Sequence, residues 1–453
     1  MARSCPVSLA LTVLMLSTVS WATADADSAT SIADHTLPNG MRVTLVTDPL
    51  TDLAAFHLAI ETTVPHEPPE LAALPELIQQ LLLDRLRTRI VDGNQIADLS
   101  DALAAGASVA LSAGDRYVEA EASLPASLLP AVLTTISELF FASQQFTDEE
   151  LATARQKLVS SYEASLTSTA FQTLSLLERA LGTNSVPGYD VATILSVVGQ
   201  ATLDDVQSAR QRLYVPSRAC LTVIGPEPHE QLLEMVNQAV GNYPAGDLPT
   251  SAATIRLPGE SSVRVGNGSD IPWASMMIGV PLPPYASSEF VVGQVAYMLL
   301  AGPEGRLTED PMLRRGFGII LPQRSQGTAS AFEAMPPRPA HMPFIAVHTV
   351  AAPGYVEQAR VRVLGHIEAL RQGEFTEEQL QTARTQLANQ YALAYDTCLS
   401  RAQLVNFNAL FGGEPGLRDD FTTMVAAVKS QDVVRLAEKY FAHHAIGLQM
   451  PGD

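Results

Sequence analysis

The sequence predicts an α+β fold of two homologous domains, each a mainly antiparallel sheet with helices packed on one face. The first observation is a repeated helix, since FTDEELATARQKLVSSY begins at Phe146 and FTEEQLQTARTQLANQY begins at Phe375. The second is a helix–strand pair at 204–225 that is echoed at 432–450 with a similar offset. A solvated helix needs no such agreement, so we interpret the pattern as an internal duplication. The third is the length of 453 residues, which fits two domains of about 200 residues.

The first half is predicted to combine several short strands with amphipathic helices. Asn39-Gly40 is a hairpin signal beside alternating apolar residues. Pro75 is tolerated in the first turn of the long helix that follows, and Thr147 with Glu150 predicts a capping box on the repeated helix. The expected elements are a hairpin over 35–48, strands at 53–62, 107–113, 116–124 and 218–225, and helices at 71–90, 94–105, 126–142, 146–162, 204–214 and 228–243.

The order of elements restarts after residues 245–260, a polar stretch broken by Pro and Gly that we predict to be the domain linker. The linker separates an N-terminal domain over 31–244 from a C-terminal domain over 261–453. The elements expected after it are strands at 273–283, 342–353 and 445–450, and helices at 287–302, 355–373, 375–391 and 432–441.

Residues 1–24 are predicted to be a signal peptide. One Arg precedes an apolar run, and Ala22 and Ala24 give the small-x-small pattern of a cleavage site. No later stretch has enough uninterrupted apolar residues to span a bilayer. We therefore expect an exported protein, with the periplasm as its compartment and no membrane span in the mature chain.

The net charge bears on nucleic-acid binding, and the cysteine count bears on disulfide formation. The net charge is −20, with 28 basic against 48 acidic residues. A nucleic acid is therefore not expected as a partner, because phosphate binding depends on clustered Lys and Arg. Cys5 leaves with the signal peptide, and Cys220 and Cys398 remain. A disulfide between them stays open, but two buried free thiols are the better prediction.

Four stretches together resemble the pitrilysin/insulinase family of zinc peptidases, which includes the mitochondrial processing peptidases and bacterial two-domain members. They are LPNGMRVTLV, HEPPELAALPELIQQLLLDR, the pair FTDEELATAR and FTEEQLQTAR, and LLAGPEGRLTEDPMLRRGFGI. The resemblance runs from His35 to the end of the chain, and it implies a peptidase-like fold for both domains.

The family's chemistry lies in a His-x-x-Glu-His motif on the first long helix, where two imidazoles hold zinc and the Glu is the general base. The resemblance places Glu76, Gln79 and Gln80 at these positions, so neither imidazole is present. Two more glutamates of the family, seven residues apart, fall at Ala154 and Ser161. The N-terminal domain thus has a degenerate zinc motif, and we expect no metal or other cofactor in this chain; zinc is expected only in an active partner.

The family also carries an Arg and a Tyr seven residues apart in its C-terminal domain, which hold the substrate backbone. Arg314 stands at the Arg position and Leu321 at the Tyr position, so the phenol is missing. Gly302 and Gly305 lie at a glycine-rich loop that contacts substrate in the non-catalytic subunit of the processing peptidases. A simple helix-to-helix turn explains the two glycines equally well.

The resemblance and the missing residues imply a pseudo-peptidase with no catalytic residues of its own. We expect the non-catalytic subunit of an exported two-subunit zinc metallopeptidase, which shapes the chamber and assists binding of a peptide or unfolded protein. The partner would be a family member that bears the zinc motif. A free-standing periplasmic peptide-binding protein is the alternative, and an active metallopeptidase with substitute ligands is a weaker one.

Overall fold

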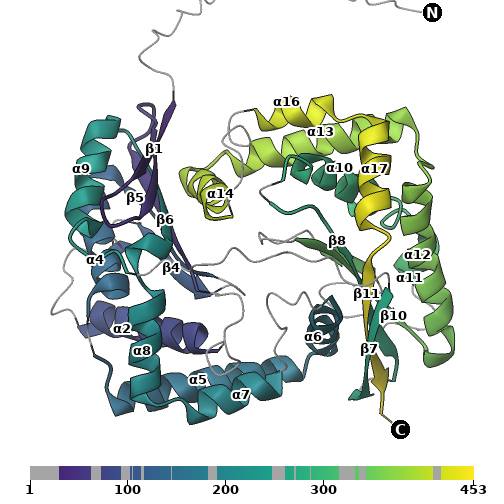
Figure 1. Ribbon diagram of the computed structural model, residues 1–453, viewed down its shortest axis with the longest axis horizontal. Coiled ribbons are helices and arrows are strands. Elements are labelled where there is room, and N and C mark those ends of the chain that lie inside the picture. Colours follow the sequence, from purple (N-terminus) through teal and green to yellow (C-terminus); the bar gives the residue numbers. More distant parts are fainter. Residues whose placement is uncertain are drawn as a thin grey trace, which may run out of the picture.

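The two halves of the chain form two separate sheets in the computed structural model (Figure 1). The described residues are 30–62, 73–92, 103–104, 106–113, 117–143, 145–181, 191–246, 261–269, 272–285, 287–315, 332–335, 343–411 and 420–452. The predicted signal peptide, Leu321, most of the predicted helix at 94–105 and all but two residues of the predicted linker lie outside them.

The first sheet has six strands in the order β1-β2-β6-β3-β5-β4. All neighbours are antiparallel except β2 and β6, which run parallel. Gly40 joins β1 to β2 with φ of 82°, a backbone conformation that favours glycine and explains the Asn-Gly signal. The strands are β1 (Ser31–Thr36), β2 (Arg42–Thr47), β3 (Leu53–Glu61), β4 (Ser108–Ala113), β5 (Tyr117–Pro125) and β6 (Ala219–Gly225).

The second sheet has five described strands in the order β7-β11-β8-β10-β9. Here β7 and β11 run parallel and the other neighbours antiparallel, so the arrangement repeats that of β2-β6-β3-β5-β4. The α+β prediction with two mainly antiparallel sheets is confirmed. The strands are β7 (Ser261–Ser269), β8 (Ala274–Pro281), β9 (Phe332–Met335), β10 (Phe344–Ala351) and β11 (His444–Pro451).

The helices of the first half either pack on the first sheet or pack against the helices that do, with the exception of α6. Thr147 caps α5 through the predicted capping box with Glu150. They are α2 (Leu74–Asp92), α4 (Leu129–Phe141), α5 (Asp148–Leu166), α6 (Thr169–Leu181), α7 (Val191–Gln200), α8 (Leu203–Leu213) and α9 (His229–Val240).

The second half supplies a matching set of helices. Thr376 caps α13 through a capping box with Gln379, as Thr147 and Glu150 do on α5. They are α10 (Phe290–Ala301), α11 (Pro311–Arg315), α12 (Val356–Arg371), α13 (Glu377–Ala394), α14 (Cys398–Leu410), α16 (Phe421–Ala427) and α17 (Ser430–Tyr440). None of the described helices is long and apolar enough to cross a membrane.

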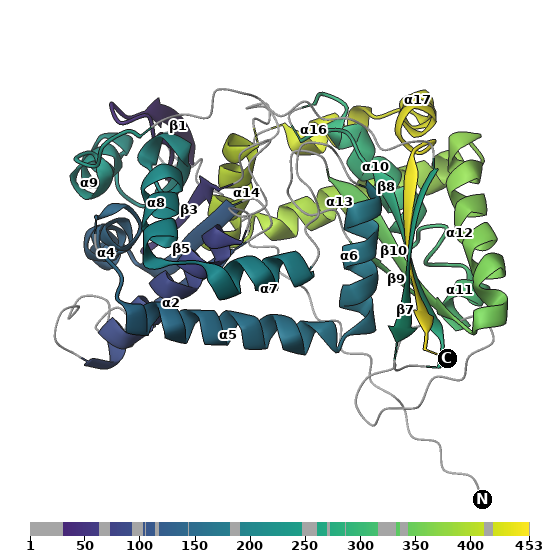
Figure 2. The same cartoon turned by 60° about the horizontal axis from the view of Figure 1, so that its bottom comes forward.

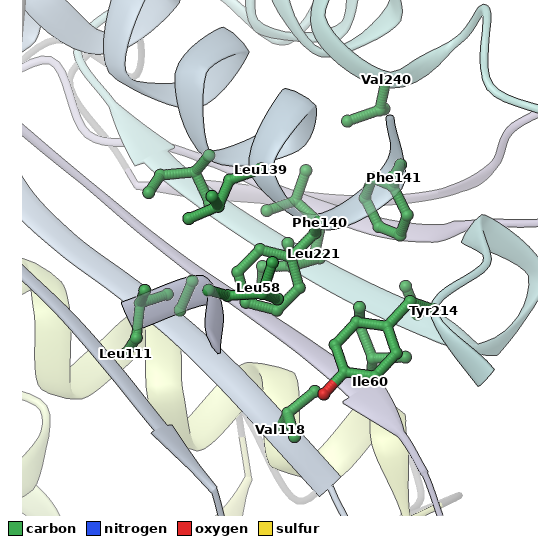
Figure 3. Close-up of a cluster of buried hydrophobic side chains, with 14 of the residues drawn as sticks. Leu58, Ile60, Leu111, Val118, Leu139, Phe140, Phe141, Tyr214, Leu221 and Val240 are labelled. Atoms are coloured by element: carbon green, nitrogen blue, oxygen red, sulfur yellow. The ribbon is translucent and has the colours of Figure 1, made fainter. Parts of the chain in front are cut away.

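The main core of the first half lies between the first sheet and its own helices. Leu58 and Ile60 of β3, Phe140 of α4 and Leu221 of β6 gather there (Figure 3), all at most 1% exposed. These strand residues point to one face because side chains alternate along a strand. The alternate residues of β3 and β6 point to the opposite face, where α14 packs.

Each half lends one helix to the other half's sheet (Figures 1 and 2). Helix α14 packs on β3 and β6 of the first sheet, and α6 packs on β7, β8 and β11 of the second. Close approach of α6 requires Gly447, since a Cβ there would lie 2.4 Å from the carbonyl oxygen of Thr173. The exchange means that both sheets are covered on both faces and that the halves share packed interfaces.

The two cysteines of the described chain are free, as predicted. Cys220 is buried in β6, where burial raises the pKa of its thiol to about 12. Cys398 begins α14 and is only partly buried, so the prediction that both thiols are buried is wrong for Cys398.

Candidate functional site

The residues predicted to stand at the zinc-motif positions lie on α2, against the repeated helix α5. Glu76 is in the first turn of α2 and is partly buried. Its carboxylate accepts a short hydrogen bond from the hydroxyl of Tyr162 on α5. The position predicted for the first imidazole thus holds a carboxylate that joins two helices. Sequence reasoning did not single out Tyr162, although it directly follows Ser161.

Gln79, at the position of the general base, is used to hold α2 onto the sheet. Its side chain is buried, and Nε2 donates to the main-chain oxygens of Ser112 at 2.9 Å and Glu119 at 3.2 Å. Ser112 of the edge strand β4 and Glu119 of β5 are paired in the antiparallel register of these two strands. The two bonds fix which end of the amide faces the sheet, because only nitrogen can donate. The Oε1 atom is buried without a hydrogen-bond partner.

Gln80, at the second imidazole position, belongs to a polar chain along the helices. Its Nε2 donates to Asp84 at 3.0 Å, and Lys157 of α5 reaches the same carboxylate oxygen at 2.8 Å. One turn further, Arg85 forms an ion pair with Glu150 at 2.6 Å. The seam between α2 and α5 is thus joined by ion pairs and hydrogen bonds between the two helices.

The two glutamate positions on α5 differ in their surroundings. Ala154 is fully buried in the hydrophobic core, while Ser161 is exposed. The core around Ala154 leaves no room for a longer acidic side chain, because protein interiors are close-packed. Neither position offers a carboxylate next to Glu76.

These residues do not fit the zinc ion that the family fold implies. Tetrahedral zinc sites are built from Cys, His and carboxylate ligands, and the motif positions offer one carboxylate, already bonded to Tyr162, and two amides. In the part of the chain that the structure describes, no three His, Cys, Asp or Glu side chains are placed to hold a metal ion.

A buried polar network lies beside Gln79 and was not anticipated from the sequence. Nε2 of His57 is 3.0 Å from Glu119, and Asn406 of α14 lies 2.8 Å from Nδ1. Since the Asn406 amide nitrogen can only donate, Nδ1 accepts, and a neutral His57 donates through Nε2. Burial raises the pKa of Glu119, but hydrogen bonds from His57 and Ser112 outweigh it and lower that pKa. His57 is the polar residue inside the apolar run of β3, but the run does not indicate its partners.

Arg314 lies on the surface, on the short helix α11. It is exposed and makes no side-chain hydrogen bond or ion pair within the described chain. The helix is anchored by Asp310, whose side chain is 1% exposed and contacts Arg362 at 2.6 Å and His366 at 2.5 Å. Asp310 also accepts hydrogen bonds from the main chain of α11. The guanidinium of Arg314 is exposed, so the cost of burying a charge gives no reason to expect a partner for it.

Gly302 and Gly305 form a tight turn at the end of α10. A Cβ at Gly302 would lie 2.6 Å from the carbonyl oxygen of Met298, and one at Gly305 would lie 2.7 Å from the Ala301 nitrogen. Close packing of the backbone thus accounts for both glycines. Contact of this turn with a substrate stays a prediction, and Leu321 lies outside the described residues.

Comparisons with known proteins agree with this architecture. Residues 200–387 match the family model described as the peptidase M16 inactive domain. No curated protein sequence matches the chain. Three solved structures have similar folds at 13–14% identity, which shows the fold alone.

The three structures match over almost their whole length. A protease from Helicobacter pylori has a TM-score of 0.74 at 14% identity, with 93% of this chain and 100% of that chain covered. A putative M16-like peptidase from Alicyclobacillus acidocaldarius has a TM-score of 0.73 at 14% identity, with 93% and 98% covered. A peptidase M16 inactive domain from Pseudomonas fluorescens has a TM-score of 0.74 at 13% identity, also with 93% and 98% covered.

Residues 200–387 thus carry the sequence pattern of the M16 inactive domain, and the described chain has the fold of M16-like peptidases. This match covers less than half of the chain, and it agrees with the resemblance to the pitrilysin/insulinase family that the sequence shows.

Proposed function

We propose that this chain is the non-catalytic subunit of an exported, periplasmic two-subunit zinc metallopeptidase. It would shape the chamber and assist the binding of a peptide or unfolded protein, while a family member with an intact His-x-x-Glu-His motif would perform the hydrolysis. The chain itself would hold neither zinc nor any other cofactor.

The observation that carries this proposal is the use of the former catalytic positions as structural contacts. Glu76 bonds Tyr162, and Gln79 holds α2 to the sheet through main-chain oxygens. A glutamine side chain cannot accept a proton from water near neutral pH, so no general base stands at that position. A peptidase-like fold without these groups supports a subunit that contributes its shape rather than its chemistry.

Co-purification of the untagged chain from its native host, followed by mass spectrometry, tests the proposal. A stoichiometric complex with a family member that bears the zinc motif supports it. Recovery of the chain alone, with peptides bound, would favour a free-standing periplasmic peptide-binding protein. Zinc-dependent hydrolysis by the isolated chain would show an active peptidase with substitute ligands.

A further inference from the structure

A cavity of about 200 Å³ opens between the end of α10 and the repeated helix α13. Its lining is partly apolar, and its polar part includes two carboxylates and one guanidinium. The apolar residues are Met298, Leu299, Phe375 and Ala383, and the charged residues are Glu304, Arg306 and Glu378. Glu304 and Glu378 are exposed and form no ion pair within the described chain.

The corresponding site in the first half lies at the start of the repeated helix α5, where an arginine of α2 takes part in an ion pair. There Arg85 of α2 lies with its guanidinium carbon 4.2 Å from the ring centre of Phe146. It donates to both carboxylate oxygens of Glu150, at 2.6 and 2.9 Å, and to the main-chain oxygen of Gln145 at 2.5 Å. The Arg85 side chain is 14% exposed, so this seam is closed by a paired charge.

The second half also has an arginine at this site, Arg306, but the residue aligned with Glu150 is not a carboxylate. The repeat aligns Glu374, Phe375 and Gln379 with Gln145, Phe146 and Glu150. Arg306 donates to the main-chain oxygen of Glu374, just as Arg85 does to Gln145. Gln379 retains the capping bond to Thr376 at 2.9 Å but does not contact the guanidinium.

Arg306 therefore forms no ion pair in the part of the chain that the structure describes, although Glu304 and Glu378 line the same cavity. Its Nε atom is buried and has no hydrogen-bond partner. A guanidinium in a partly desolvated site favours a planar carboxylate. The negative charge that Glu150 provides to Arg85 in the first half is thus absent from Gln379 in the second, and the carboxylate of a ligand can provide it.

We propose that this cavity binds a free apolar amino acid in its zwitterionic form. The α-carboxylate pairs with Arg306, the α-ammonium group faces Glu304 and Glu378, and the side chain covers Phe375 and Met298. The size is suitable, because sites for drug-sized ligands have volumes of about 300–1,000 Å³, and this cavity accepts a smaller molecule. The proposal concerns this chain alone and does not depend on the proposed catalytic partner.

Three related molecules test the two charged contacts by titration calorimetry with the folded mature chain. L-leucine carries both charges, leucinamide lacks the carboxylate, and N-acetyl-leucine lacks the ammonium group. We expect leucine to bind at least tenfold more tightly than either analogue. Equal binding of leucine and leucinamide would overturn the proposal, as would the absence of leucine binding.

Two substitutions act on the carboxylate contact in different ways. Arg306→Gln removes the cation and should weaken leucine binding at least tenfold. Gln379→Glu leaves Arg306 in place and restores the carboxylate that Glu150 provides in the first half, so it should also abolish binding while raising the melting temperature. Arg360→Gln on the exposed face of α12 is the matched control and should bind leucine as the native chain does.

The second variant keeps the test decisive if Arg306→Gln fails to fold. Leucine binding that survives in Gln379→Glu, with that variant folded by circular dichroism, would show that the guanidinium is not the carboxylate receptor. Binding that is lost equally in Arg360→Gln would place the ligand elsewhere and would also refute the assignment.

Discussion

The side-chain amide of Asn406 donates to Nδ1 of His57 at a distance of 2.8 Å. Asn406 belongs to α14 of the second half, and His57 belongs to β3 of the first sheet. The same amide donates to the main-chain oxygen of Cys220 at 3.1 Å, and its oxygen accepts from Thr222 at 3.3 Å. One fully buried side chain thus connects the halves through three bonds.

Replacement of Asn406 by Ala should therefore destabilise the whole chain by about 3 kcal/mol, because it leaves several buried polar groups without partners. The measurement is the urea midpoint followed by circular dichroism. Asn389→Ala on the exposed side of α13 is the control and should change stability by less than about 0.5 kcal/mol. A loss for Asn406→Ala as small as that of the control would show that the inter-half network contributes little.

The sequence could predict most of this fold because the relevant signals are local. The strand at 53–62 is a nearly continuous apolar run, and Thr147 with Glu150 forms the predicted capping box. The sequence could not predict that α6 and α14 exchange sheets. An apolar helix face shows that burial is needed, but it does not identify the surface that provides it.

The candidate site was predictable in position but not in its contacts. The spacing of Glu76, Gln79 and Gln80 places them along one side of α2. Their actual partners come from residues far along the chain, such as Tyr162 of α5 and Ser112 of β4. Such pairings depend on how helices and strands meet, and no local pattern encodes them.

Gln79→Glu should destabilise the protein by about 2–4 kcal/mol at neutral pH, since a carboxylate cannot donate to the oxygens of Ser112 and Glu119. Burial should raise the folded-state pKa of the new carboxyl above its unfolded value. The penalty should therefore shrink as the pH falls and the carboxyl becomes protonated. Urea denaturation at pH 7.5 and 5 measures this.

Gln156→Glu on the exposed face of α5 introduces the same charge without burial and is the control. Its stability should stay within about 0.5 kcal/mol of the native chain at both pH values. A Gln79→Glu variant that is as stable as this control would mean that the two bonds to the sheet have little energetic weight.

Asp310→Asn should cost about 2 kcal/mol near pH 7. Burial raises the pKa of Asp310, but bonds from Arg362, His366 and the main chain outweigh it and lower that pKa from 3.8 to about 2. A depressed folded pKa adds stability above the unfolded pKa, and this stability is lost as the pH falls through the folded value. The difference between variant and native chain should therefore be largest above pH 5 and decline between about pH 4 and 2.

Thermal denaturation between pH 2.5 and 7 checks this prediction. Asp420→Asn is the control, because Asp420 is exposed and makes no side-chain capping bond to α16. A difference between Asp310→Asn and the native chain that does not vary with pH would show that the ion pairs of Asp310 do not produce the effect.

The native chain should contain far less than one zinc per molecule after dialysis against micromolar metal. The triple variant Glu76→His, Gln80→His and Ser161→Glu should hold close to one, because the first two positions share a face of α2 and Ser161 is the neighbour of Tyr162. Ala154 is left unchanged, since it is fully buried. Peptidase activity should stay absent, because Gln79 provides no general base.

Elemental analysis measures the bound zinc in both proteins. One tightly held zinc in the native chain, lost on Glu76→Ala, would mean that substitute ligands build a site. A triple variant that folds but takes up no zinc would show that α2 and α5 have moved away from the geometry a metal needs.

Arg314→Ala should lower the peptidase rate of the complex with a zinc-bearing partner without unfolding this subunit. The guanidinium is exposed on α11 and bonds nothing within the described chain, so it is available to a carbonyl or carboxylate outside it. Asp310 accepts hydrogen bonds from the main chain of α11, and these bonds fix the position of the helix that carries Arg314. We expect about a tenfold loss in kcat/KM, as one charge-assisted hydrogen bond of about 1.4 kcal/mol would give.

Arg315→Ala is the matched control, because Arg315 is the exposed neighbour on the same helix. Both variants must form the complex equally well in size-exclusion chromatography before their rates are compared. A rate that drops equally in both would indicate a general effect of surface charge on the chamber, and Arg314 would have no special contact. An unchanged rate in Arg314→Ala, with the complex formed, would make this residue an ordinary surface arginine.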